Sequence, residues 1–127
     1  MKTYSNLQEV YDTAVAGLSS QEFKPSYGGR NGTSCAYRGG NGRKCAIGWC
    51  IPDELYSPEM EGKTVYSMFA EHWKAMREIF PISISVGALR ELQNCHDIAV
   101  VYPGSMRGNL RAFGLKYRLQ IPDSLQD

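Results

Sequence analysis

The sequence has no long apolar run and almost no net charge. Its 127 residues carry 14 Lys and Arg against 13 Asp and Glu, for a formal charge of +1. This balance gives no long-range attraction to nucleic acid or to an acidic membrane surface. No apolar stretch approaches the roughly 20 residues that cross a bilayer, and the N-terminus lacks the pattern of a secretory signal. We expect one globular domain over residues 1–127, without a membrane or nucleic-acid partner, which stays in the compartment where it is made.

Closely spaced pairs of cysteines are also missing. The four cysteines stand at positions 35, 45, 50 and 95, whereas structural zinc sites usually hold ligands in pairs about two to four residues apart. The spacing argues against a zinc site built from Cys35, Cys45, Cys50 and the Cys95-His96 pair. It favours reduced, buried thiols in a reducing cytosol. We expect neither a metal nor another cofactor.

Acidic residues are absent from residues 23 to 52, where basic residues stand among glycines. Backbone N–H groups in glycine-rich turns, together with arginine side chains, bind phosphates and carboxylates. The sequence has neither a GxxxxGK[ST] nor a GxGxxG motif, so no standard phosphate loop is predicted. Two interpretations remain, an anion-binding face and an ordinary solvated surface. The candidate binding residues are Arg30, Arg38, Arg43, Lys44, Arg107 and Arg111.

Residues 34 to 47 have the pattern of a β-hairpin. Two short runs flank a loop of glycine and asparagine, in which an Asn-Gly step favours the positive φ angles of a reversing chain. A register that pairs Tyr37 with Cys45 and Cys35 with Ile47 places these four side chains on one face. An isolated two-stranded ribbon is only marginally stable, so helices must cover that face.

Apolar residues recur at helical spacing in four other segments. They predict helices at about residues 6–18, 65–80, 86–99 and 105–113, the second with a break near its middle. The fold class predicted is therefore α+β, a single small domain with four helices packed around a central β-hairpin at residues 34–47.

Local signals mark the ends of these helices and the connections between them. Ser5 and Gln8 match a capping box, Ser85 can cap the third helix, and Gly114 is placed to end the fourth. Trp73 is predicted to lie in the core. The alternating residues 117–121 predict an extended tail or a further strand. Residues 51–62 contain two prolines and four acids, including the pair Glu59 and Glu61, and are predicted to face solvent.

A nucleophilic thiol is the main catalytic candidate. Cys45 would need a base, which His96 can supply, and an orienting group such as Asp97 or Asp53. His96 also falls on the apolar stripe of its helix, where a buried histidine bonded to a backbone group is the alternative. Only the distances between these groups can decide.

Four segments of the sequence are distinctive when taken together. They are CAYRG at 35–39, KCAIG at 44–48, IPDELYSPEMEG at 51–62 and LQNCHD at 92–97. This combination resembles a family of small uncharacterised proteins encoded by bacteriophages, prophages and their bacterial hosts. The resemblance spans most of the chain. It implies a phage-type accessory protein in the bacterial cytoplasm, with a part in host interaction or counter-defence, and it implies no particular catalytic or ligand-binding residue.

Three functional hypotheses follow. The first is a non-enzymatic protein that binds a bacterial host protein or a phosphorylated small molecule. The second is a thiol-dependent hydrolase or transferase that uses Cys45 and His96. The third is a structural protein that self-associates through exposed Tyr27, Tyr56 and Tyr102.

Overall fold

The computed structural model describes residues 3–28, 34–102 and 104–126. In this part of the chain the α-helices are α1 (Leu7–Ser20), α2 (Val65–Glu71), α3 (Trp73–Ile79), α4 (Val86–Val101) and α5 (Met106–Lys116). The strands β1 (Tyr27–Gly28) and β2 (Ser34–Cys35) are two residues each. Short 3₁₀ turns are η1 (Gly40–Gly42), η2 (Gly48–Cys50), η3 (Pro58–Met60) and η4 (Asp123–Leu125). No helix of the described residues is long and apolar enough to cross a membrane.

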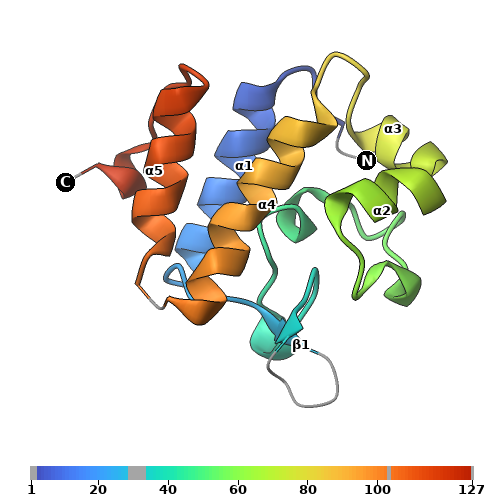
Figure 1. The fold of residues 1–127 in the computed structure, drawn as a ribbon, viewed down its shortest axis with the longest axis horizontal. Coiled ribbons are helices and arrows are strands. Elements are labelled where there is room, and N and C mark those ends of the chain that lie inside the picture. The colour runs from blue at the N-terminus through green and yellow to red at the C-terminus, as the bar shows by residue number, and fades with distance from the viewer. Residues whose placement is uncertain (1–2, 29–33, 103, 127) are drawn as a thin grey trace.

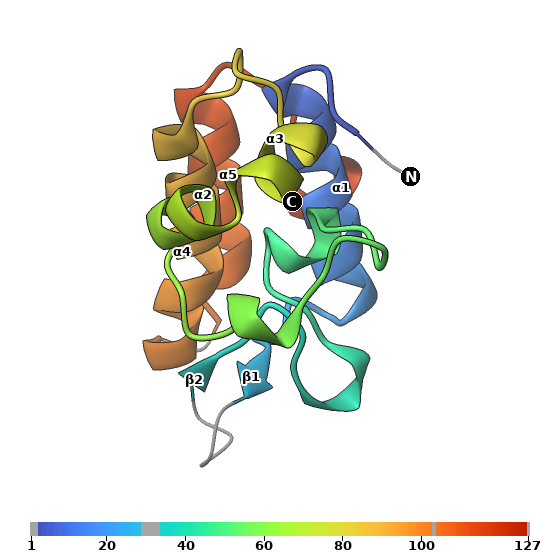
Figure 2. The same ribbon diagram turned by 90° about the vertical axis from the view of Figure 1, so that its right-hand side faces the viewer.

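Helix α4 is the centre of the arrangement, since it contacts α5 on one side and α2 on the other (Figure 1). Helix α1 joins the same core. The Tyr11 hydroxyl donates a hydrogen bond of 2.7 Å to the backbone carbonyl of Leu110 in α5, and its ring stacks on Phe113. The two strands and the loop that follows them gather at one end of the helices (Figure 2). The core thus lies between helices, and the strands close one end of it.

Side-chain caps set the first residue of three helices. Ser85 caps α4 as predicted, because its hydroxyl accepts from the backbone N–H of Ala88 at 3.3 Å. The predicted capping box at Ser5 and Gln8 is wrong by one residue. Asn6 is the cap, accepting from the Glu9 N–H at 3.0 Å, and the Glu9 carboxylate accepts from the Ser5 N–H at 2.8 Å. The exchange of bonds is that of a capping box with Asn6 in the capping position.

The predicted helix at residues 65–80 is divided at His72, whose backbone leaves the helical region at φ −125° and ψ 39°. Both halves bury a face, on which Met68 and Met76 are inaccessible to solvent. The prediction that Trp73 belongs to the core is wrong. The break turns this side chain outward, and 58% of it is exposed.

Helix α5 continues past the predicted stop at Gly114, which lies inside the helix and is buried. A side chain at this position would collide with Tyr11 and Ile121. Glycine therefore serves close packing here, and the end of α5 is at Lys116. The tail forms the turn η4 and no strand in the described residues, so the alternative of an added strand is also wrong.

The predicted central hairpin is wrong, and with it the α+β fold class. Strand β2 pairs antiparallel with β1, Tyr27 opposite Cys35, instead of with residues 44–47. Arg38 and Lys44 form a single isolated bridge, after which the chain turns into η2.

Burial on both faces explains why the hairpin does not extend. A half-exposed ribbon alternates buried and exposed residues, but the consecutive residues Ala36 and Tyr37 are both buried, as are Ala46 and Ile47. The helices and the following loop enclose both faces of these segments. Their burial therefore does not depend on a regular ladder of hydrogen bonds between them. Over the described residues the fold is mostly helical, with one minimal strand pair at its end.

The acidic segment at residues 51–62 is anchored rather than fully solvated. The Glu61 carboxylate accepts hydrogen bonds from the backbone N–H groups of Tyr37 at 2.9 Å and Arg38 at 3.0 Å, and another from the Tyr56 hydroxyl. Glu59 is exposed, as predicted for this segment. Glu61 fixes residues 62–65 beside residues 35–37, and these two stretches become walls of the pocket described below.

Candidate functional site

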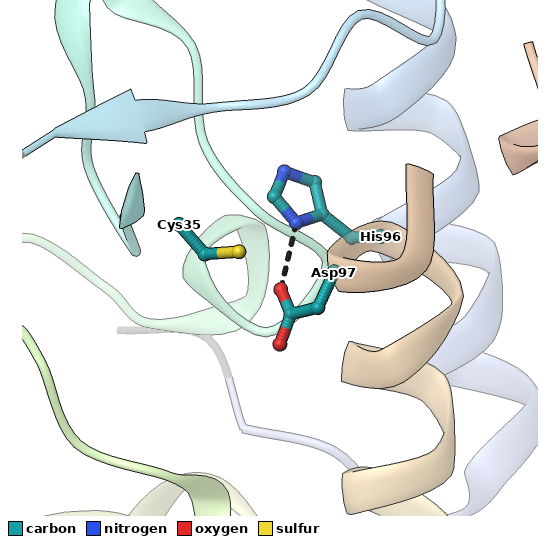
Figure 3. A group of neighbouring side chains, drawn as sticks. All are labelled: Cys35, His96 and Asp97. Carbon is teal, nitrogen blue, oxygen red and sulfur yellow. Dashed lines mark hydrogen bonds and ion pairs between the residues drawn. The ribbon is translucent and has the colours of Figure 1, made fainter. Parts of the chain in front are cut away.

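Cys35, His96 and Asp97 come together where β2 meets the C-terminal half of α4 (Figure 3). One sulfur, nitrogen or oxygen atom from each of the three lies within 4.8 Å of the other two. The sequence predicts Cys45 as the thiol beside His96. The fold brings Cys35 to the imidazole and carboxylate instead.

His96 is fully buried, and both of its ring nitrogens have partners. Nε2 accepts a hydrogen bond of 2.8 Å from the backbone N–H of Ser26, while Nδ1 lies 2.9 Å from Asp97 Oδ1. Because a backbone N–H can only donate, Nε2 is the bare nitrogen and Nδ1 carries the proton that it shares with Asp97. His96 has no free lone pair with which to take a proton from a thiol. The buried structural histidine, which the sequence left as the alternative, matches these contacts.

Asp97 accepts from more than His96. Its Oδ1 atom also accepts from Gln93 Nε2 at 2.9 Å, and the Cys35 sulfur lies near the carboxylate, within 4.8 Å. Burial, and after it the negative charge of Asp97, raises the pKa of Cys35 to about 12. At neutral pH Cys35 is therefore a protonated thiol, and a protonated thiol is a poor nucleophile.

Zinc accepts thiolate, imidazole and carboxylate ligands, and Cys35, His96 and Asp97 could supply one of each. A metal ion at Nδ1 would have to displace the Nδ1 proton. The neutral ring would then carry its proton on Nε2, pointing at the N–H of Ser26, and two donors would face each other. Because His96 and Asp97 are already joined by a hydrogen bond, this group of side chains fits a metal poorly.

The predicted nucleophile Cys45 is sealed inside the protein, with 1% of its surface exposed. Its sulfur accepts from the Gly48 N–H at 3.4 Å, and burial raises the pKa of the thiol far above its ordinary value. Neither acid that the sequence predicted as an orienting group is available to a catalytic site at Cys45. Asp97 is bonded to His96, and Asp53 forms an ion pair with Arg38. The structure does not assemble a thiol nucleophile at Cys45.

A pocket of about 210 Å³ opens beside the cluster. Its walls are the stretch from Cys35 to Tyr37, the stretch from Gly62 to Val65, and one face of α4. We call it the α4 pocket. On the helix face it is lined by Arg90, Gln93 and Asp97, which are spaced three and four residues apart and so share one side of the helix. The volume suits a small metabolite, since drug-sized ligands occupy upward of about 300 Å³.

Positive charge dominates one part of the α4 pocket. Arg90 is half-buried and has no hydrogen-bond or ion-pair partner in the part of the chain that the structure describes. Lys63, on the opposite wall, forms an ion pair of 3.2 Å with Glu71, whose side chain is more exposed than that of the lysine. The pocket thus holds one unpaired cation and a second that is partly neutralised.

Arg38 does not offer its charge to a ligand. Its guanidinium forms an ion pair of 2.6 Å with Asp53, donates to the Ile51 carbonyl at 3.2 Å and stacks on the Tyr56 ring. The side chain is only 24% exposed. Arg38 fastens the loop at residues 51–56 to the segment that follows β2.

The other predicted cations that the structure describes lie on other parts of the surface, where Arg107 and Arg111 border one hollow on α5. The Lys44 ammonium lies 4.7 Å from the centre of the Trp49 ring, and Arg43 borders a shallow hollow beside the same ring. Arg107 donates to backbone carbonyls of the C-terminal tail, and Arg111 is exposed on α5. Arg30 lies outside the described residues. None of these side chains lines the α4 pocket.

The three tyrosines proposed for self-association also differ from one another. Tyr102 is 66% exposed. Tyr27 and Tyr56 are partly buried, and the Tyr56 ring carries the Arg38 guanidinium. They do not form one exposed aromatic set.

Arg90 and Lys63 are the pocket residues that the sequence prediction missed. The helical spacing of Arg90, Gln93 and Asp97 is a signal that the sequence does contain. A helix that buries one stripe of residues and aligns polar groups on the adjacent stripe can line a pocket. The sequence contains no such signal for Lys63, because the position of Lys63 depends on Glu61, which holds residues 62–65 against residues 35–37.

Comparison with known proteins adds no relative. No protein-family model matches the chain, and no curated protein and no solved structure matches it.

Proposed function

We propose that this chain is a non-enzymatic binding protein that takes a small molecule of a bacterial host, one that carries a carboxylate or phosphate group, into the α4 pocket. It would act in the host cytoplasm as a phage-type accessory protein, the setting implied by the resemblance of residues 35–39, 44–48, 51–62 and 92–97. The observation that carries the proposal is Arg90, a cation without a protein partner among the described residues on the wall of a pocket. Partly enclosed arginines usually have a partner, and a ligand carboxylate or phosphate would supply one.

Binding is favoured over catalysis because the groups that chemistry would need are already engaged. The Nε2 atom of His96 is bonded to Ser26. Burial keeps the thiols of Cys35 and Cys45 protonated by raising the pKa of each. A nucleophile with neither a lowered pKa nor an available base gives little rate enhancement.

The test is retention of a ligand by the purified protein. Wild-type protein is incubated with a small-molecule extract of bacterial cells, passed through a desalting column and examined by native mass spectrometry. The matched variants are Arg90→Gln and Arg111→Gln, which remove one cation from α4 and from the exposed surface of α5. We expect wild type and Arg111→Gln to retain the same compound with an acid group, and Arg90→Gln to retain at least tenfold less. No retained compound, or equal retention by Arg90→Gln, would refute the proposal.

A further inference from the structure

The α4 pocket has unlike charges at its two ends. Arg90 and Asp97 lie seven residues apart on the same side of α4, about 10 Å along the helix axis. Lys63 adds positive charge to the wall opposite the helix. Asp97 is one-third exposed, although it already accepts from His96 and Gln93.

Gln93, which lies between the two charges, is fully used by the protein. Its side-chain oxygen accepts from the backbone N–H of Ile47 at 2.9 Å, and its Nε2 donates to Asp97 at 2.9 Å. Gln93 therefore holds the pocket wall and positions Asp97, and with 6% of its surface exposed it offers a ligand little contact. The ligand is therefore recognised by the charged residues at the two ends of the pocket.

We infer that the ligand of this pocket is a small zwitterion of amino-acid size, with its acid group at Arg90 and Lys63 and its ammonium group at Asp97. This inference rests on the proposed function, and it goes further by naming the class of ligand. A simple anion would leave Asp97 beside it as an uncompensated like charge. A cation alone would leave Arg90 without a partner. The volume of about 210 Å³ is below that of a typical drug-sized site and has room for a short amino acid.

The experiment uses small probes that differ in charge, with the zwitterions in a series of increasing length. The zwitterionic probes are glycine, β-alanine, 4-aminobutanoate and 5-aminopentanoate. The controls are butanoate, butylamine and inorganic phosphate. Affinity is measured by calorimetry, and the site is located by amide shifts in ¹⁵N-labelled wild-type protein. We expect at least one zwitterion to bind ten or more times tighter than butanoate or phosphate, with shifts at both Arg90 and Cys35.

Three variants separate the two ends of the pocket. Asp97→Asn keeps an oxygen that can accept from His96 and Gln93 but removes the charge. It should lower zwitterion affinity at least tenfold and leave butanoate affinity unchanged or higher. Arg90→Gln should weaken both probes, and Arg111→Gln neither. If Asp97→Asn does not fold, the affinities of the probes for the wild-type protein and the amide shifts that they cause test the inference by themselves.

The outcomes distinguish the inference from the proposed function. Phosphate or butanoate binding as tightly as every zwitterion would overturn the zwitterion inference and leave an anion-binding pocket. The zwitterion inference also fails, and the anion-binding pocket stands, if a cell extract supplies an Arg90-dependent ligand while no zwitterionic probe binds. Absence of binding both to all probes and to any compound in the extract would overturn both.

Discussion

The backbone N–H of Ser26 donates a hydrogen bond of 2.8 Å to Nε2 of His96, a residue 70 positions later in the chain. Both residues are fully buried. This bond joins the segment before β1 to α4, and it fixes which imidazole nitrogen carries the proton. The same contact that organises the end of the fold occupies the imidazole nitrogen that could otherwise act as a base near Cys35.

Replacing His96 by alanine should destabilise the protein by about 2 to 4 kcal/mol, because the buried Ser26 N–H loses its acceptor and the ring leaves a cavity. His72→Ala, at the junction of α2 and α3, is the control and should cost under about 1 kcal/mol. Urea denaturation measures both. In ¹⁵N-edited NMR spectra of wild type, Nδ1 of His96 should carry the proton, and a proton on Nε2 would contradict the assignment.

Cys35 should react slowly with alkylating agents. With a pKa of about 12 in place of the ordinary 9.0, its thiolate fraction at pH 8 is lower by about 1000-fold. The rate of iodoacetamide modification, located by peptide mass spectrometry, should therefore be lower by a similar factor than that of an unstructured cysteine peptide. Asp97→Asn should raise the rate, since it removes a charge that opposes ionisation. Equal rates for the protein and the peptide would contradict the burial of this sulfur.

Stability should fall as the pH rises above about 9, in part through Cys45. Burial raises the pKa of this thiol above its ordinary value of 9.0, so at pH 10 the unfolded chain has lost a proton that the folded chain keeps. The lost stabilisation from one such thiol between pH 7 and pH 10 is about 1.4 kcal/mol. Cys45→Ala should therefore lose about that much less than wild type over the same interval. Urea midpoints at the two pH values give the comparison, and identical losses in both proteins would argue against the buried thiol.

Arg38→Ala should cost about 1 to 2 kcal/mol, mainly because the half-buried guanidinium loses its stacking on Tyr56 and its bond to the Ile51 carbonyl. Its partner Asp53 is 81% exposed, so Asp53→Ala should cost under about 1 kcal/mol. Arg43→Ala serves as the surface control and should be close to neutral. Thermal melts of the three variants test this order, and equal melting temperatures for Arg38→Ala and Arg43→Ala would refute it.

Two single substitutions test the core itself. Ile47→Asp should cost at least about 4 kcal/mol or prevent folding, because Ile47 has no exposed surface and the new carboxylate would be buried. Trp73→Ala should cost under about 1 kcal/mol, because most of the ring is already in solvent. Circular dichroism during denaturation distinguishes them. A large loss at Trp73 would mean that α3 packs differently.

The sequence by itself determined where most of the helices lie. The apolar spacing of residues 7–18 and 86–99 and the cap at Ser85 are local features, and each acts within one or two helical turns. The buried state of Ile47 and Cys45 was also predictable, because apolar residues in a hairpin or in a packed loop both have to leave water.

Only the tertiary structure decided how residues 34–47 pair and what surrounds Cys35. A strand chooses its partner through contacts between distant segments, and the local pattern of these residues does not distinguish Tyr27–Gly28 from residues 44–47 as that partner. The same holds for Trp73, since the break at His72 changes which side of α3 faces the core. The cluster of Cys35, His96 and Asp97 and the cationic end of the α4 pocket arise where β2, α4 and the loop held by Glu61 meet, so they exist only once the chain has packed.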